Sequence, residues 1–110
     1  MIYFDNSATT KVAPAVLETY TKVSQQIWGN PSSLHKMGEQ AYLLLEQARK
    51  QIADLLGVMP GEIFFTSGGT EGDNWVIKGT AFEKRHFGNH LITSQVEHPA
   101  VLNTMAQLER

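Results

Sequence analysis

The sequence contains no cysteine. A disulfide scaffold, a thiolate zinc site and a nucleophilic thiol are therefore excluded within these 110 residues. Charged residues make up only 18% of the chain, and 9 basic residues stand against 11 acidic ones with no block of like charge. This balance does not favour direct binding to nucleic acid or to an anionic membrane surface.

The sequence also lacks the basic segment and apolar core of a secretory signal, and it has no apolar run long enough to span a membrane. We therefore expect a cytoplasmic protein with no membrane partner. What the sequence does contain is a 42% share of apolar residues, which is typical of a globular chain. Its 110 residues suffice for one small domain and not for two.

Apolar residues recur at helical spacing in the first half of the chain. The first such stretch predicts a helix over about residues 14–28, which begins at a proline and is closed by Gly-Asn-Pro. The second predicts a long helix that is capped by Ser32 or Ser33 and stopped by Gly57.

The hydrophobic period changes after Pro60. Residues 62–66 and 90–94 are short apolar runs that predict strands, and a helix that ends near Arg85 is expected between them. A further helix is expected from Pro99. The fold class is therefore predicted to be α/β, with a βαβ unit of a mainly parallel sheet and flanking helices.

The turn TSGGTE joins the first predicted strand to its helix. Gly68 and Gly69 let backbone approach a ligand closely, and Ser67 and Thr70 offer hydroxyls. Unpaired N–H groups and the macrodipole at a helix N-terminus favour an anion, so one interpretation is a phosphate site at Gly69 and Thr70. The Walker and dinucleotide spacings are both absent. The other interpretation is an ordinary connection in which Thr70 caps the helix.

A second candidate, His98, follows the second predicted strand. Because ligands gather at the carboxyl ends of parallel strands, we expect His98 to lie near Gly69 and Thr70. An imidazole there can stack on a flat ring or move a proton near neutral pH. A plain loop histidine before Pro99 is the alternative.

The remaining histidines are weaker candidates. His86 and His90 are four residues apart, but they flank a polar loop that is not predicted to be helical, so no metal is predicted. His35 and the loop of residues 5–10 could reach a ligand from elsewhere in the fold, although helix capping and a polar turn explain them equally well.

Four ordered segments span nearly the whole chain, namely YFDNSATT, GNPSSLH, TSGGTEGDN and HLITSQVEHPAVL. They resemble the N-terminal part of the cysteine desulfurases, in the NifS/IscS-like branch of the class V aminotransferase family. The resemblance implies that residues 1–110 are an N-terminal fragment, an incomplete segment of a class V aminotransferase domain. This segment would belong to the large domain of a fold-type I transferase that depends on pyridoxal 5′-phosphate (PLP).

The resemblance also implies an activity. Family members are homodimers that use PLP to convert L-cysteine to L-alanine, and they pass the sulfur as a persulfide to iron–sulfur scaffold or tRNA-thiolation proteins. By motif, Gly69 and Thr70 correspond to residues that hold the cofactor phosphate, and His98 to one that stacks on the pyridine ring and assists proton transfer. Four weaker candidates lie near the active site by resemblance: Ala8, Thr9, Asn30 and His35.

The chain also departs from the family. Members are several times longer, and neither the Ser/Thr-x-His-Lys motif of the cofactor lysine nor the sulfur-accepting cysteine occurs here. We therefore expect the chain alone to be inactive. Two alternatives stay open at this point: another class V enzyme such as a selenocysteine lyase, and a non-catalytic module that binds a phosphate ligand or a partner protein.

Overall fold

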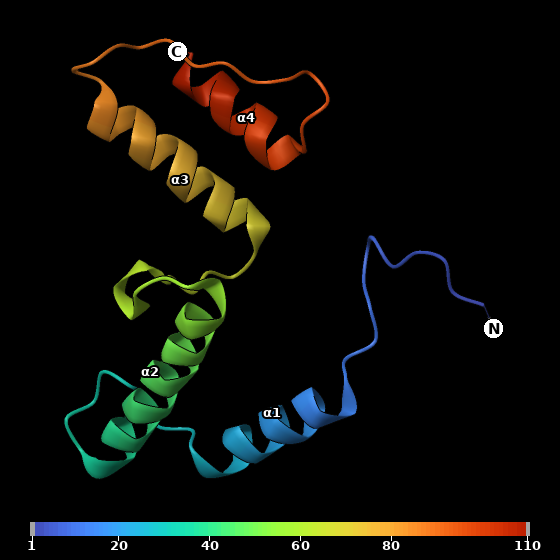
Figure 1. The fold of residues 1–110 in the computed structure, drawn as a ribbon, viewed down its shortest axis with the longest axis vertical. Helices are drawn as coiled ribbons and strands as arrows, with labels where there is room; N and C mark the ends of the chain where they lie inside the picture. Colours follow the sequence, from blue (N-terminus) through green and yellow to red (C-terminus); the bar gives the residue numbers. More distant parts are fainter. Residues whose placement is uncertain (1, 110) are drawn as a thin grey trace. The chain divides into compact units, whose positions relative to one another are not determined.

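The structure, a computed structural model, describes residues 2–109, which form helices in two compact units (Figure 1). The first unit extends to Ile63 and the second begins at Phe64. In the described part of the chain no helix is both long and apolar enough to cross a membrane. The elements in chain order are α1 (Pro14–Gln26), α2 (Lys36–Leu56), the 3-10 helix η1 (Pro60–Glu62), α3 (Gly69–Lys84) and α4 (Pro99–Leu108).

The ends of α1 and α2 follow from proline and glycine chemistry. Pro14 begins α1, where its fixed φ suits the first turn and its missing N–H costs no hydrogen bond. The helix ends at Gln26, slightly before the predicted end, because Ile27 leaves helical dihedrals. Gly57 stops α2 as predicted, with a φ of 68° that glycine adopts without steric cost.

The N-cap of α2 is His35, so the prediction of a serine cap was wrong. The Nδ1 atom of His35 accepts a hydrogen bond from the Gly38 N–H at 3.2 Å. The two serines are used earlier in the loop, where the N–H of Ser32 donates to the Asn30 side chain and that of Ser33 to the Asn30 carbonyl, each at 2.9 Å. Asn30 thus accepts the N–H groups of both serines, and the histidine caps the helix.

The strands predicted at 62–66 and 90–94 do not form within residues 2–109. Glu62 ends η1 instead, and the rest of both segments is irregular. Ile63 already has extended dihedrals, with φ −99° and ψ 122°. A strand is stable only beside a hydrogen-bonded neighbour, and the described residues supply none to these segments. The helices predicted around them are present as α3 and α4.

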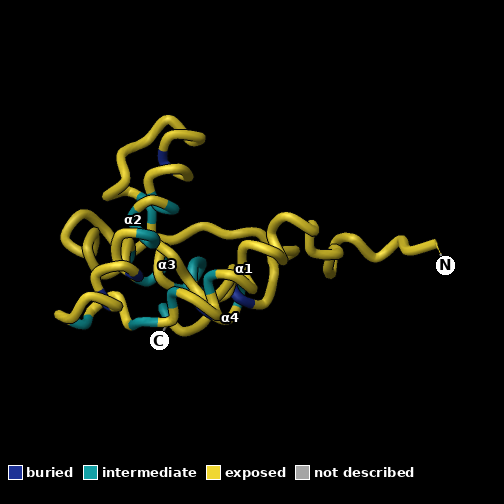
Figure 2. The backbone as a smooth tube through the Cα atoms, turned by 90° about the horizontal axis from the view of Figure 1, so that it is seen from below, coloured by how far each residue is buried: buried dark blue, intermediate teal, exposed yellow. Residues whose placement is uncertain are grey.

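Few residues are buried in either unit (Figure 2). The buried apolar side chains among the described residues are Ala41, Ala53 and Ala100. In the second unit α4 packs along α3, and it buries Thr104, whose hydroxyl donates to the Ala100 carbonyl at 2.7 Å. Many large apolar side chains, both tryptophans included, remain exposed.

Candidate functional site

The TSGGTE turn leads directly into α3. Gly68 is the N-cap with extended dihedrals, so Thr70 lies in the first helical turn and does not cap the helix. The first intrahelical bond runs from the Gly72 N–H to the Gly68 carbonyl at 3.1 Å. The N–H groups of Gly69, Thr70 and Glu71 therefore have no acceptor within the helix, and the positive end of its dipole lies beside them.

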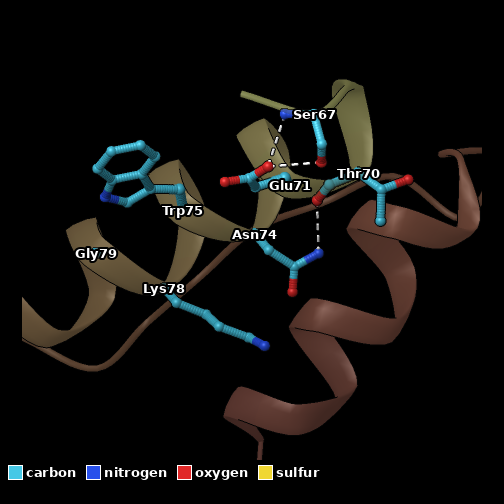
Figure 3. A pocket seen from close by; sticks show the side chains of 7 residues that line it. All are labelled: Ser67, Thr70, Glu71, Asn74, Trp75, Lys78 and Gly79. Atoms are coloured by element: carbon cyan, nitrogen blue, oxygen red, sulfur yellow. Dashed lines mark hydrogen bonds between the residues drawn. The ribbon is translucent and has the colours of Figure 1, made fainter. Parts of the chain in front are cut away.

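The carboxylate of Glu71 closes this turn. Its Oε2 atom accepts two hydrogen bonds from Ser67, one from the hydroxyl at 2.6 Å and one from the backbone N–H at 2.7 Å. These bonds, the hydroxyl's first, lower the pKa of Glu71. Sequence reasoning missed this role, because Ser67 and Glu71 are four residues apart and do not have the Ser-x-x-Glu spacing of a capping box. The Ser67 hydroxyl is thus engaged, whereas Thr70 points its side chain away from this pair (Figure 3).

A shallow hollow of about 560 Å³ lies along α3 beside the turn (Figure 3). Within it, the Asn74 amide donates to the Thr70 carbonyl at 2.9 Å. Trp75 meets Phe64 edge to face, with ring centroids 5.4 Å apart. Lys78 adds a half-buried cation. The residues that line it are Ser67, Thr70, Glu71, Asn74, Trp75, Lys78 and Gly79.

The lining residues Asn74 and Lys78 were not candidates from the sequence. Together with Thr70 they recur every four residues along α3, which places all three on one helix face. That spacing was the available signal. The face offers a hydroxyl, an amide and an ammonium group, and each of these can donate a hydrogen bond to an anion.

His98 is the exposed N-cap of α4. Its Nδ1 atom accepts a hydrogen bond from the Ala100 N–H at 3.1 Å. Helices α3 and α4 pack side by side and run in the same direction (Figure 1), so Gly69, Thr70 and His98 lie at the same end of the helix pair. His98 does not line the hollow along α3.

The four weaker candidates belong to the first unit, where each takes part in local structure. The N–H groups of Ala8 and Thr9 bond to the Asp5 carbonyl at 3.1 and 3.4 Å and form a turn. Asn30 and His35 hold the loop before α2, as described above. Their role in a ligand site stays a prediction. No group of three or more metal-ligating side chains that could hold an ion occurs among residues 2–109.

The first turn of α3 fits a phosphate group. A Cβ atom placed on Gly68 or Gly69 would meet no other atom within 4 Å, and neither glycine has a left-handed φ. Neither packing nor backbone conformation in the described residues therefore requires glycine at these two positions. Their missing side chains leave the N–H groups open to a ligand, as an anion site at a helix N-terminus needs.

Comparison with known proteins shows which family the chain resembles. The chain is 67% identical over 109 residues to a NifS/IcsS protein homolog of Lactobacillus delbrueckii subsp. bulgaricus. The matched region is 99% of this chain and 28% of that protein. It is 51% identical over 108 residues to cysteine desulfurase IscS of Methanosarcina thermophila, and the matched region is 98% of this chain and 27% of that relative.

A solved structure of a NifS-like protein matches with a TM-score of 0.91 at 46% identity, over 98% of this chain and 30% of that one. The chain thus spans less than a third of the length of these relatives. The family model described as Aminotransferase class-V matches residues 2–110. The chain therefore belongs to the aminotransferase class-V family and has the fold of the corresponding part of its members.

Proposed function

We propose that this chain forms the cofactor-phosphate part of a PLP-dependent cysteine desulfurase, which converts L-cysteine to L-alanine and passes the sulfur on as a persulfide. The observation that carries the proposal is the first turn of α3. It has backbone donors without acceptors beside two glycines that the local structure does not require. Two further facts support it: class V family members generally depend on PLP, and relatives at 51% identity are named cysteine desulfurases.

Gly69 and Thr70 would hold the phosphate of the cofactor. Their backbone N–H groups lack helical acceptors, and the Thr70 hydroxyl adds a donor on the same turn. Hydrogen bonds to a charged acceptor are stronger than neutral ones, and the helix dipole adds to the attraction. These groups would fix the position of the cofactor and leave its reactive end free.

His98 would stack on the pyridine ring. When bound, the cofactor supplies the electron sink that the chemistry at the substrate α-carbon requires. An imidazole on its face would orient the ring and exclude water from that side. The four candidates of the first unit, Ala8, Thr9, Asn30 and His35, are proposed to line the same active site in the assembled enzyme.

The proposed reaction also needs an anchoring lysine in a Ser/Thr-x-His-Lys context and a sulfur-accepting thiol, and this sequence contains neither. We propose that polypeptide outside residues 1–110 supplies both. The same polypeptide would supply the strands that pair with residues 62–66 and 90–94. The chain would then be an N-terminal segment of the large domain of a fold-type I enzyme with a mainly parallel sheet.

The wider setting is proposed as well. The enzyme would be a cytoplasmic homodimer that takes L-cysteine as substrate and delivers sulfur to iron–sulfur scaffold or tRNA-thiolation proteins. The names of the relatives favour cysteine over selenocysteine as the substrate. No observation in the structure specifically favours a non-catalytic binding module.

The test is a PLP titration of the full-length protein, followed by near-ultraviolet and visible absorption, together with alanine release from L-cysteine. We expect saturable binding and turnover. Replacing Thr70 with Ala should weaken cofactor retention by about 1.5 to 3 kcal/mol through the loss of one charge-assisted hydrogen bond. Thr80→Ala, on the same helix but outside the first turn, is the matched control. Unchanged retention in Thr70→Ala would remove Thr70 from the phosphate site, and no binding at all would reject the proposal.

A further inference from the structure

Both histidines proposed for the active site cap a helix through the same ring atom. Nδ1 of His98 accepts the Ala100 N–H at 3.1 Å, and Nδ1 of His35 accepts the Gly38 N–H at 3.2 Å. A backbone N–H can only donate, so the nitrogen that accepts it must carry a lone pair and no proton. In a neutral imidazole the proton then resides on the other nitrogen, Nε2.

The sequence around His98 leaves one donor for this cap. Pro99 occupies the first helical position and has no N–H. The N–H of Val101 already donates to the His98 carbonyl at 2.9 Å. Ala100 therefore holds the N–H of the first turn that remains for a side chain, and His98 takes it.

The neighbouring carboxylate does not compete for the ring. Glu97 Oε1 accepts the Ser94 hydroxyl at 2.9 Å, within the loop that precedes α4. Ala100 is buried where α4 packs along α3, so the donor sits on a packed part of the helix. The cap thus joins the ring to a packed helix and fixes which ring edge faces away from that helix.

We propose that the cap of α4 holds the neutral His98 ring as the Nε2–H tautomer. In this state Nε2 donates a hydrogen bond into the site. The ring has no free lone pair that could accept a proton, because Nδ1 accepts the Ala100 N–H. Its use toward the cofactor rests on the proposed function above, whereas the tautomer does not. A proton can reach Nδ1 of the ring only when the bond to Ala100 opens. His98 in this state stacks and donates, and general-base action at this position requires a break in the cap.

The deciding measurement is the ¹⁵N NMR spectrum of the imidazole nitrogens in the full-length protein, at about pH 8, where an ordinary imidazole is neutral. We expect an unprotonated Nδ1 and a protonated Nε2 at His98, and the same pattern at His35. His86 and His90 cap no helix in the described residues and serve as references for an uncapped ring. A protonated Nδ1 at His98, or the tautomer mixture of the references, would overturn the proposal.

Two substitutions test the donor role separately from the fold. His98→Asn keeps an acceptor where Nδ1 lies, because asparagine is a good N-cap, but it has no donor at the place of Nε2. His98→Gln carries an amide N–H at that place and gives up the cap. We expect cofactor retention in both and at least about tenfold more turnover with Gln than with Asn, the effect of about one hydrogen bond to a charged group. Higher turnover with Asn than with Gln would overturn the donor role. If the wild-type protein did not bind PLP, the proposed function would be rejected, but the NMR result on the tautomer would still hold.

Discussion

The guanidinium of Arg49, on α2, donates a hydrogen bond to the backbone carbonyl of Ile63, which follows η1. Its Nε atom also donates to the Glu46 carboxylate at 3.0 Å. One half-buried side chain thus ties the long helix to the segment that returns from it, fourteen residues further along the chain. Because it donates from two points at once, the planar guanidinium is difficult to replace.

Arg49→Lys should therefore loosen the segment around η1. Lysine keeps the charge but cannot reach both acceptors with the same geometry, and the loss of a charged hydrogen bond costs about 1.5 to 3 kcal/mol. Faster amide hydrogen exchange at residues 61–63 of the full-length protein measures the effect. Lys50→Ala is the control, since the Lys50–Asp54 pair is exposed and such pairs contribute about 0.3 to 0.5 kcal/mol. Equal exchange in both variants would contradict the prediction.

A second prediction concerns Gly38. A Cβ atom there would lie 2.2 Å from the Ser33 carbonyl oxygen and 2.8 Å from that of Asn30. Gly38→Ala should therefore force the loop before α2 outward at a cost of about 1 to 3 kcal/mol, measurable as a lower midpoint in urea. Gly61→Ala, where a Cβ would meet nothing within 4 Å, should leave the midpoint nearly unchanged.

Gly69 should behave in the opposite way. Gly69→Ala meets no steric obstacle and should leave the fold intact or slightly more stable, because alanine is the better helix former. In the full-length protein the added methyl group should nevertheless weaken PLP binding about tenfold or more by crowding the phosphate donors. Gly72→Ala, one turn further along α3, is the matched control. If both variants bind equally well, the phosphate does not sit at Gly69.

The bonds between Ser67 and Glu71 predict a pH effect at the start of α3. Because they lower the pKa of Glu71 below its ordinary value of 4.5, they stabilise the turn fully above that value. This contribution is lost as the pH falls through the lowered pKa. In a carboxyl ¹³C NMR titration, Ser67→Ala should move the Glu71 pKa back toward the ordinary value. An unchanged titration would mean that the hydroxyl contributes nothing.

The exposed apolar surface predicts association of the 110-residue chain when it is studied alone. Phe64, Val96 and Leu55 are 65%, 93% and 86% exposed, and few side chains are buried to balance them. We expect concentration-dependent oligomers in light scattering and strong binding of a hydrophobic dye. A monomer with a sharp, reversible melt would contradict this.

The helices were predictable because their signals lie within a few residues. Pro14, Pro99 and Gly57 act through their own backbone dihedrals, so their roles could be predicted from the sequence and are confirmed. The cap of α2 was missed because serine and histidine can both serve, and the choice depends on how the loop packs around Gly38. The strands failed for a different reason, since a strand depends on a neighbour that residues 2–109 do not contain.

The site could be predicted only in part. Gly69, Thr70 and His98 stood out by motif, and the structure places them at one end of the α3–α4 pair. Glu71 and Lys78 acquired roles only from the hydrogen bonds and the hollow along α3. A sequence motif identifies residues that are expected to contact a ligand. The side chains that form hydrogen bonds around them can be identified only once the helix is built.

The short reach of the polar contacts bears on the order of folding. The side-chain hydrogen bonds of the caps and turns connect residues no more than four positions apart. Contacts of this range need little loop closure, and helical turns form within about a microsecond. The helices should therefore exist while residues 62–66 and 90–94 still search for strand partners. Until those partners arrive, these two segments are the places where a nascent chain would recruit a chaperone.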